Sequence, residues 1–367
     1  MRPGGDSSAP TWLACGVPKK LPSDKIQSIV EGVSGGAVLV LVTGGAGYIG
    51  SHVVRQMAKR GYKIVVYDNL SRGHRFLVNG FECVIGSIGE REKLARALRG
   101  VGAVMHFAAF ADVEESVKDP RKYFENNVVS GLALMDSILE AGIRHFIFSS
   151  SCAVYGLPAQ VPIAENAARN PTNPYGASKL AFEHVLEAYS NAYGLRFVSL
   201  RYFNAAGADE SGEVGELHNP ETHLIPRILE VAAGVRDGVE IYGTDYRTAD
   251  GTCVRDYIHV NDLGDAHLLA LEYLLNGGES TAFNLGSGAG YSVLNVVSAV
   301  EEVTGHKLTK HFLPRRPGDP PVLIADSRRA NELLHWNPSR SLREIIATAW
   351  KWMRCRPMKY SVDRFVD

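Results

Sequence analysis

Runs of apolar residues alternate with amphipathic stretches through the first half of the chain. Residues 37–43 (AVLVLVT) form an unbroken, largely β-branched run, which is typical of a parallel strand covered on both faces. A glycine-rich turn and a helical pattern to about residue 60 follow it. The alternation then repeats, with strands expected at 63–67, 81–85, 104–107, 145–149 and 197–202 and helices near 90–98 and 123–141. This order predicts an α/β fold with a Rossmann-type, doubly wound parallel sheet.

The pattern loosens after about residue 205, where Gly, Pro and Asn become frequent and the apolar segments shorten. We therefore expect a sheet domain over 37–204 and a smaller α/β substrate-binding domain over 205–356, which includes a helix at 342–353. Residues 1–36, rich in Gly, Pro, Ser and Lys, are interpreted as a flexible N-terminal extension, and residues 357–367 as a tail.

Length and charge agree with this organisation and exclude some functions. At about 150 residues per domain, 367 residues suit two domains, and 45% hydrophobic with 22% charged residues is near the globular average. Lys and Arg total 39 against 40 for Asp and Glu, so the net charge is -1. That balance argues against a nucleic-acid partner, whose binding relies on massed basic charge, but it permits a small anionic ligand.

Cysteine usage and hydropathy indicate the compartment. The five cysteines are widely spaced and form no CxxC pair or Cys/His cluster, so we expect neither a disulfide framework nor a metal site. No apolar run approaches about 18 residues, and no signal-peptide pattern opens the chain. A soluble cytoplasmic protein without a membrane partner is the expectation.

The turn after the first strand carries three spaced glycines. Gly44, Gly47 and Gly50 fall on a GxxGxxG spacing, which suits a tight turn and close approach of the backbone to a pyrophosphate at the helix N-terminus. Asp68 ends the second strand, where a carboxylate can accept both hydroxyls of an adenosine ribose and repels a 2′-phosphate. The glycines alone could form a plain βα turn, but with Asp68 they predict NAD binding. Arg72, close by, is interpreted as a solvated loop charge.

A tyrosine and a lysine open a later helical pattern. Tyr175 and Lys179 are four residues apart and therefore share one helix face. A lysine ammonium and an oxidised nicotinamide both stabilise a phenolate, and a tyrosine whose pKa is lowered can act as a base near neutral pH. Ser149, Ser150 and Ser151 stand at the C-terminal end of a strand, where open α/β sheets bind ligands. An isolated YxxxK match could be surface decoration, but in this setting we interpret it as catalytic.

Several motifs together resemble a known family. They are TGGAGYIGSH, HFAAFA, SSSCAVYG, NPYGASK, RYFNAAGA, HLIPRI, GTCVRDYIHVNDL and RRPGD. Over about residues 38–353 the chain resembles the UDP-galactose 4-epimerases, in the extended branch of the short-chain dehydrogenase/reductase superfamily. The resemblance implies tightly bound NAD and reversible C4 epimerisation of UDP-glucose and UDP-galactose through a 4-keto intermediate. It also implies that 254–265 returns to the first domain.

The resemblance implies a role for each matching residue. Tyr175, Lys179 and Ser151 would be catalytic, with Ser150 as the alternative serine. Cofactor contacts would come from Gly44, Gly47, Tyr48, Ile49, Gly50, Asp68, Asn69, Ser87, Ile88, Phe107, Ala108, Ala109, Asn126, Ser149, Tyr175, Lys179 and Tyr202. The UDP-sugar would meet Ser151, Tyr175, Asn204, His223, Tyr242, Arg255, Arg316 and Asp319, and the backbone of Leu224. The arginines would hold the diphosphate, although each could instead serve an internal ion pair or a turn, and no metal ligand is implied.

Four positions depart from the family pattern. Ser87 stands where many members have an aspartate that contacts adenine, and Glu114 stands where a glycine is usual. His223 replaces an asparagine of some members. Leu323 stands where some members have a bulky tyrosine that closes the sugar pocket. A smaller residue there could admit an N-acetyl group, so UDP-N-acetylhexosamines are alternative substrates.

Proteins of the same fold can have other functions, and individual residues of this chain favour or disfavour each of them. A UDP-pentose 4-epimerase would use the same residues. A nucleotide-sugar 4,6-dehydratase would resemble proteins with an Asp-Glu pair where this chain has Cys152 and Ala153. A non-catalytic NAD sensor has no need of Tyr175, Lys179 and the UDP-binding arginines together. The resemblance also implies a homodimer through a four-helix contact, for which 123–139 and 178–192 are candidates.

Overall fold

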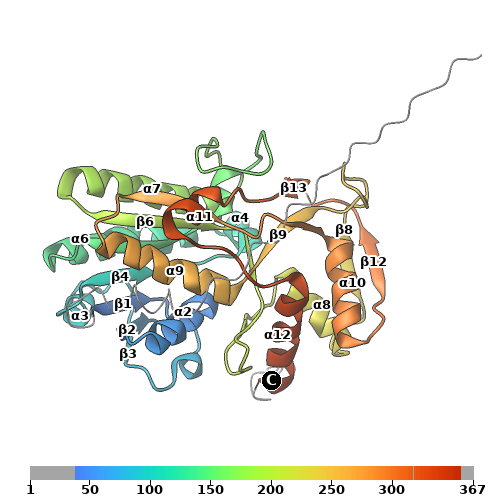
Figure 1. Cartoon of the computed structure of the whole chain (residues 1–367), viewed down its shortest axis with the longest axis horizontal. Helices are drawn as coiled ribbons and strands as arrows, with labels where there is room; N and C mark the ends of the chain where they lie inside the picture. Colours follow the sequence, from blue (N-terminus) through green and yellow to red (C-terminus); the bar gives the residue numbers. More distant parts are fainter. Residues whose placement is uncertain (1–37, 317, 357–367) are drawn as a thin grey trace, which may run out of the picture. The chain divides into compact units, whose positions relative to one another are not determined.

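The computed structural model describes residues 38–316 and 318–356. Its main element is a seven-stranded, all-parallel sheet with strand order β10-β6-β5-β4-β1-β2-β3 (Figure 1). The bounds are β1 (Leu39–Thr43), β2 (Lys63–Asp68), β3 (Cys83–Ile85), β4 (Ala103–His106), β5 (His145–Ser151), β6 (Arg196–Tyr202) and β10 (Thr281–Leu285). The strand order reverses between β1 and β4, which creates the crevice where open α/β sheets bind ligands.

Two layers of helices cover this sheet. On one face, α2 (Tyr48–Lys59) and α9 (Val260–Leu275) pack against each other and share a buried core with β1 and β6. On the other face, a second core holds α3 (Arg91–Ala97), α6 (Ser130–Glu140) and α7 (Pro174–Tyr193). Both faces are therefore apolar, which explains the unbroken hydrophobic run of the first strand.

A smaller sheet lies beyond the carboxyl end of β6. Its centre is β9 (Val254–His259), which pairs with β7 (Asn204–Ala206), β11 (Gly290–Ser292) and β13 (Val322–Leu323). A two-stranded sheet joins β8 (Val239–Tyr242) to β12 (Lys310–Leu313). The helices of this part, which share its own apolar core, are α8 (Leu224–Ala232), α10 (Val293–Thr304) and α12 (Leu342–Cys355).

The two halves of the chain interleave. The described residues, 38–316 and 318–356, belong to one compact unit, so the expected boundary at 204/205 stays a prediction. The segment 254–265 divides: β9 lies in the small sheet, whereas α9 packs on the large sheet. The second half also supplies β10, and α11 (Arg328–Leu334) packs against it. The expected extension 1–36 and tail 357–367 lie outside the described residues.

Short helices follow β4 along the rim of the sheet. They are α4 (Val113–Lys118), α5 (Pro120–Phe124) and the π-helix η2 (Glu125–Val129), which leads into α6. Asp112 caps α4 by accepting a hydrogen bond from the backbone N–H of Glu115 at 2.8 Å. Glu114, which replaces the usual glycine, lies inside this regular helix and pairs with Lys118 at 2.7 Å. The family's glycine is therefore not needed for this local geometry.

The remaining elements are short. The 3-10 helices η1 (Arg75–Val78) and η3 (Cys152–Tyr155) follow β2 and β5. Within residues 38–316 and 318–356, no helix combines the length and the apolar character needed to cross a membrane. The cysteines at 83, 152, 253 and 355 all carry free thiols.

Candidate active site

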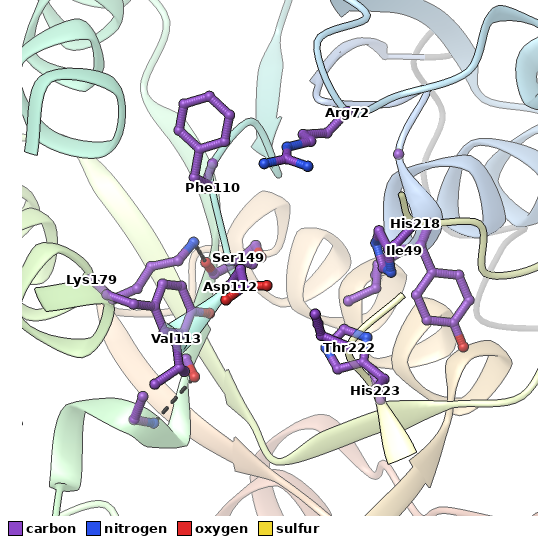
Figure 2. Close-up of a pocket in the computed structure, with 18 of the residues that line it drawn as sticks. Ile49, Arg72, Phe110, Asp112, Val113, Ser149, Lys179, His218, Thr222 and His223 are labelled. Carbon is purple, nitrogen blue, oxygen red and sulfur yellow. Dashed lines mark hydrogen bonds between the residues drawn. The ribbon is translucent and has the colours of Figure 1, made fainter. Parts of the chain in front are cut away.

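A cavity of about 1090 Å³ opens at the carboxyl ends of the parallel strands, between the large sheet and the small one. Figure 2 shows Lys179 and Ser149 on one side of it and His218 and His223 on the other. Nearly all the predicted site residues line this cavity, from the glycine turn through to Asp319. Leu224 does not: it begins α8, and its side chain packs against the core of the small sheet.

The glycine turn approaches its neighbours too closely for side chains. Gly44 has a φ of 71°, and a Cβ atom on it would lie 2.4 Å from the backbone nitrogen of Ala108. A Cβ atom on Gly50 would lie 2.4 Å from the carbonyl oxygen of Gly44. Gly47 caps α2 without a side-chain hydrogen bond, and Tyr48 lines the cavity behind it. This helix end therefore presents uncapped backbone N–H groups to an anion.

Asp68 organises the same turn from the end of β2. One carboxylate oxygen accepts the Ala46 N–H at 2.9 Å, and the other accepts the Leu70 N–H at 2.8 Å. Burial raises the pKa of Asp68, and these hydrogen bonds partly oppose the rise. Arg72 also lines the cavity, where it pairs with Glu115 at 2.8 Å and is not simply solvated (Figure 2).

The adenine end departs from the family as expected. Ser87 lines the cavity, and its backbone N–H donates to Glu90 at 2.7 Å while its carbonyl accepts the Tyr67 hydroxyl at 3.0 Å. The backbone is thus fixed without an aspartate. A carboxylate at the ribose position, an uncapped helix end and a large cavity together fit a dinucleotide of the NAD type.

Strand alternation separates the three serines at the end of β5. Ser149 and Ser151 line the cavity, whereas Ser150 points to the opposite face and donates a hydrogen bond to Glu183 at 2.6 Å. The carboxylate of Glu183 is also bound by Arg201, at 2.9 and 2.7 Å. Ser150 is thereby occupied in a buried ion-pair cluster, so the geometry favours Ser151 over Ser150.

Tyr175 and Lys179 project from the first turns of α7. Asn173 caps this helix at the N–H of Gly176, where a Cβ atom would lie 2.5 Å from the Ala153 carbonyl. The ammonium of Lys179 donates to the backbone carbonyl of Ser149 at 2.7 Å and lies 5.9 Å from the centre of the Tyr175 ring. The helix therefore holds both side chains against the end of β5.

The pKa values of this pair differ from the sequence expectation. Burial lowers the pKa of Lys179 to about 7. Burial also raises the pKa of Tyr175 to about 12, against a smaller lowering by the hydroxyl of Ser151. Lys179 therefore loses its proton at a lower pH than Tyr175 does. The protein groups alone do not lower the pKa of the tyrosine, because desolvation outweighs them.

Charged and aromatic residues line the other end of the cavity. Arg255 pairs with Asp319 at 2.5 Å and also donates to the carbonyl of Pro320 at 2.8 Å. The guanidinium of Arg316 lies 3.9 Å from the ring centre of Tyr242. These cations and a carboxylate suit a nucleoside diphosphate, although two of them bind each other here.

Several lining residues were missed by the sequence analysis. The ammonium of Lys122 lies 4.4 Å from the ring centre of Phe110. The side-chain amide of Asn127 accepts a hydrogen bond from the Phe110 N–H and donates one to the Phe110 carbonyl. Arg227 projects from α8 and pairs with Glu240 at 2.7 Å. No sequence spacing distinguishes Phe110 as a lining residue. Arg227, however, lies one helical turn beyond the predicted site residue His223, so the sequence could have predicted it.

Comparisons with known proteins agree with this geometry. The model of the NAD dependent epimerase/dehydratase family matches residues 40–286. The UDP-glucose 4-epimerase of Rhizobium leguminosarum bv. trifolii is 49% identical over 315 residues, which cover 85% of this chain and 96% of the relative.

Solved structures extend the likeness to the fold. The UDP-glucose 4-epimerase of Brucella ovis in complex with NAD has 50% identity and a TM-score of 0.84, covering 86% of this chain and 98% of its own. The UDP-Glc/GlcNAc 4-epimerase of Campylobacter jejuni has 40% identity and a TM-score of 0.77, covering 87% and 99%. These matches confirm the expected doubly wound α/β fold.

Proposed function

The chain belongs to the NAD dependent epimerase/dehydratase family, and we propose that it is a UDP-glucose 4-epimerase. The observation that carries the proposal is one cavity that joins three features. An uncapped helix end suits a dinucleotide, Ser151 ends β5 and Tyr175 projects from the start of α7 beside it, and Arg255 and Arg316 line the far side. The reaction is the reversible inversion of C4 in UDP-glucose and UDP-galactose, with NAD as the cofactor.

The chain's own residues bind and orient the sugar. Arg255 and Arg316 neutralise the diphosphate, Asp319 accepts the uridine ribose hydroxyls, and Tyr242 flanks the base. Because Asp319 binds Arg255 at 2.5 Å, substrate binding exchanges this internal pair for contacts to the nucleotide. Asn204 and His223 contact the diphosphate side of the cavity that they line.

Tyr175 handles the proton at the sugar O4. When bound, NAD would supply a hydride acceptor for C4 and a positive charge on its nicotinamide ring. Tyr175 takes the O4 proton at its phenolic oxygen and returns it when C4 is reduced again, so the cycle has no net redox change. Ser151 bridges O4 and the phenol. Lys179 binds the ribose of the cofactor and, when protonated, favours the phenolate.

One observation supports a second substrate class. Leu323 lines the cavity next to Arg255 in the β9–β13 pairing, where its side chain has no hydroxyl and no ring. The Campylobacter jejuni relative is named for both glucose and N-acetylglucosamine nucleotides. We therefore extend the proposal to UDP-N-acetylhexosamines.

The site does not suit the dehydratase alternative. Cys152 and Ala153 stand where an acid pair would be needed, and burial raises the pKa of the Cys152 thiol to about 12. A neutral thiol is a poor acid for elimination. A UDP-pentose epimerase would use the same residues and is an arm of the experiment below.

We also propose a cytoplasmic homodimer. Free thiols at Cys83, Cys152 and Cys253 suit a reducing compartment. Val129 and Phe124, on the short helices before α6, have exposures of 61% and 39%. Apolar side chains exposed this far support a helical interface that involves the 123–139 segment.

The test is an assay of purified protein without added NAD. UDP-glucose, UDP-galactose, UDP-GlcNAc and UDP-arabinose are incubated separately, and 4-epimers are followed by chromatography. Interconversion of the two hexoses is expected, with slower turnover of UDP-GlcNAc. Protein that carries NAD but yields no 4-epimer of any of these sugars would overturn the proposal.

A further inference from the structure

Four metal-ligating side chains converge beside the cavity, on the segment that joins β7 to α8. They are Glu216, His218, Glu221 and His223, and their nearest ligating atoms all lie within 4.8 Å of one another. Among the described residues this is the one such group of three or more His, Cys, Asp or Glu donors. Figure 2 shows His218 and His223 on the same wall of the cavity.

We propose that this cluster is a binding site for a divalent transition-metal ion, with zinc the best match. Two imidazoles and two carboxylates form a four-ligand donor set of the kind that zinc takes in tetrahedral sites. Two carboxylates balance a doubly charged cation. The proposal departs from the expectation that the chain carries no metal, and it does not rest on the proposed function.

The distances surround a point that an ion could occupy. Nδ1 of His218 lies 3.1 Å from Oε1 of Glu216 and 3.8 Å from Oε2 of Glu221. Nδ1 of His223 lies 3.7 Å from Oε1 of Glu221 and contacts Oε1 of Glu216. Ligands about 2.0–2.2 Å from a tetrahedral ion would be about 3.3–3.6 Å apart. Small side-chain shifts therefore bring the four atoms into range.

One ligating nitrogen is enclosed without a hydrogen bond. Nδ1 of His218 is buried and has no hydrogen-bond partner among the described residues, although the Glu216 carboxylate is near. An imidazole nitrogen that faces two carboxylates calls for a positive charge between them, which either a proton or a metal ion can supply. An ion at the centre would satisfy this nitrogen and both carboxylates at once.

The surroundings hold the ligands in place. The side chains of Glu216 and Glu221 are only 5% and 6% exposed. Oε1 of Glu221 accepts the backbone N–H groups of Thr222 and His223 at 2.8 and 2.9 Å, and Trp352 donates to the Glu216 carbonyl at 2.8 Å. Such outer contacts orient the ligands of protein metal sites.

The donor set implies a structural ion. Four protein ligands fill a tetrahedral site and leave no position for substrate. The segment that carries them packs beside α2, where the rings of Tyr48 and His218 lie 6.4 Å apart, edge to face. The ion would fix this wall of the cavity against the helix that begins at the glycine turn.

The experiment measures metal content in the untagged full chain. After exposure to zinc and dialysis against a weak chelator, mass spectrometry of the protein should find about one zinc per chain. Zinc should also raise the melting temperature, because an ion that binds only the native state stabilises it. Magnesium at the same concentration should do neither, since it prefers oxygen ligands.

Variants locate the ion. His218→Ala and the near-isosteric Glu221→Gln should each reduce zinc content at least tenfold and abolish the zinc-dependent rise in melting temperature. His306→Ala, at an exposed histidine after α10, is the matched control and should behave as the parent. Fewer than 0.1 zinc per parent chain, or full zinc content in folded His218→Ala or Glu221→Gln protein, would overturn the proposal. The parent measurement stands even where a variant fails to fold, and none of these readouts depends on turnover.

Discussion

The predicted catalytic side chains at one end of the cavity are buried, whereas the predicted nucleotide-binding side chains at the other end are more exposed to solvent. Ser149, Tyr175 and Lys179 are 7%, 9% and 3% exposed, and among the described residues the lysine donates to the Ser149 carbonyl and forms no ion pair with a carboxylate. At the nucleotide end, Arg316 is exposed and stacks on an aromatic ring, while Asp319 is 28% exposed and pairs with Arg255.

The difference shows how the two ends can be used. Desolvation at the catalytic end lowers the pKa of Lys179 to about 7 and raises the pKa of Tyr175 to about 12, so small changes there alter the chemistry. At the nucleotide end, Arg255 and Asp319 can exchange their mutual ion pair for contacts to the nucleotide. Substitutions should therefore lower turnover at the first end and weaken binding at the second.

Removing the phenol at the catalytic end should have the largest effect. Tyr175→Phe keeps the ring in its pocket but deletes the group that exchanges a proton with O4. We expect kcat to fall about 10³-fold, within the range that a positioned acid–base group contributes. NAD content and the Kd for UDP, measured by calorimetry, should change less than about twofold.

A tyrosine on the same helix provides the control. Tyr189 also lies in α7, where its hydroxyl donates to Asp136 at 3.0 Å, outside the cavity. Tyr189→Phe should keep parental kcat. If Tyr175→Phe kept more than a tenth of the parental kcat, the proton role assigned to Tyr175 would be wrong.

A buried charge lies just behind the catalytic strand, and it should affect stability before turnover. Glu183 binds Arg201 through both carboxylate oxygens, and their side chains are 2% and 5% exposed. Glu183→Gln should reduce the free energy of unfolding by about 3 kcal/mol at pH 7, because it leaves Arg201 without its counter-charge. Urea unfolding of NAD-saturated protein measures this loss.

The loss should depend on pH in one direction. Burial would raise the pKa of Glu183, but its bonds to Arg201 and Ser150 lower it below the usual value. A lowered carboxyl pKa stabilises the fold above the unfolded pKa of about 4.3, and this stability disappears as pH falls through the folded value. The deficit of Glu183→Gln should therefore shrink below about pH 4.

Glu187→Gln is the matched control. Arg169 binds both Glu183, at 3.2 Å, and Glu187, at 2.8 Å, but the side chain of Glu187 is 47% exposed. Its cost should stay under about 1 kcal/mol. Equal losses for both variants would contradict the special role of the buried pair.

At the nucleotide end, the expected loss is in binding. Arg255→Ala removes a cation that can make charge-assisted hydrogen bonds to the diphosphate. We expect the Kd for UDP to rise about 10- to 100-fold, which corresponds to the 1.5–3 kcal/mol typical of such bonds, with a smaller change in kcat. Arg328→Ala, at an exposed arginine paired with Asp326, should leave both unchanged. An unchanged Kd for UDP in Arg255→Ala would remove Arg255 from the nucleotide site.

The fold could be predicted where the pattern is local. The strands expected between 37–43 and 197–202 are short segments dominated by apolar residues, and the structure contains each of them within a few residues. The edge strand β10 was missed, because its pairing with β6 joins segments far apart in the chain. The division of 254–265 between two sheets was missed for the same reason, since periodicity does not specify tertiary partners.

The site shows the same limit. The glycine turn and the Tyr175–Lys179 pair are short-range patterns, and the structure brings them to one cavity. To choose between Ser150 and Ser151, one must know which side chains of β5 point to the cavity, and this follows from the pairing of β5 in the sheet. The raised pKa of Tyr175 could not be foreseen either, because spacing reveals a neighbouring charge but not the depth of burial.

The smallest predicted effect concerns which sugar the cavity admits. Leu323 lies next to Arg255 and lines the cavity. An aromatic ring in place of the leucine side chain should therefore crowd a 2-N-acetyl group of the sugar but leave the contacts to the diphosphate unchanged. Leu323→Tyr should lower kcat/KM for UDP-GlcNAc about tenfold, the scale of modest steric discrimination, while kcat/KM for UDP-glucose changes less than about twofold.

Leu323→Met, of similar volume, is the control and should preserve both values. Parallel losses for the two sugars would show that the tyrosine disturbs the β9–β13 pairing and not the acetyl pocket. A selective loss of activity on UDP-GlcNAc would instead add to the comparison of the two ends. The uncharged side chain at position 323 would then determine which sugar is accepted, while the charged residues beside it determine how tightly the nucleotide binds.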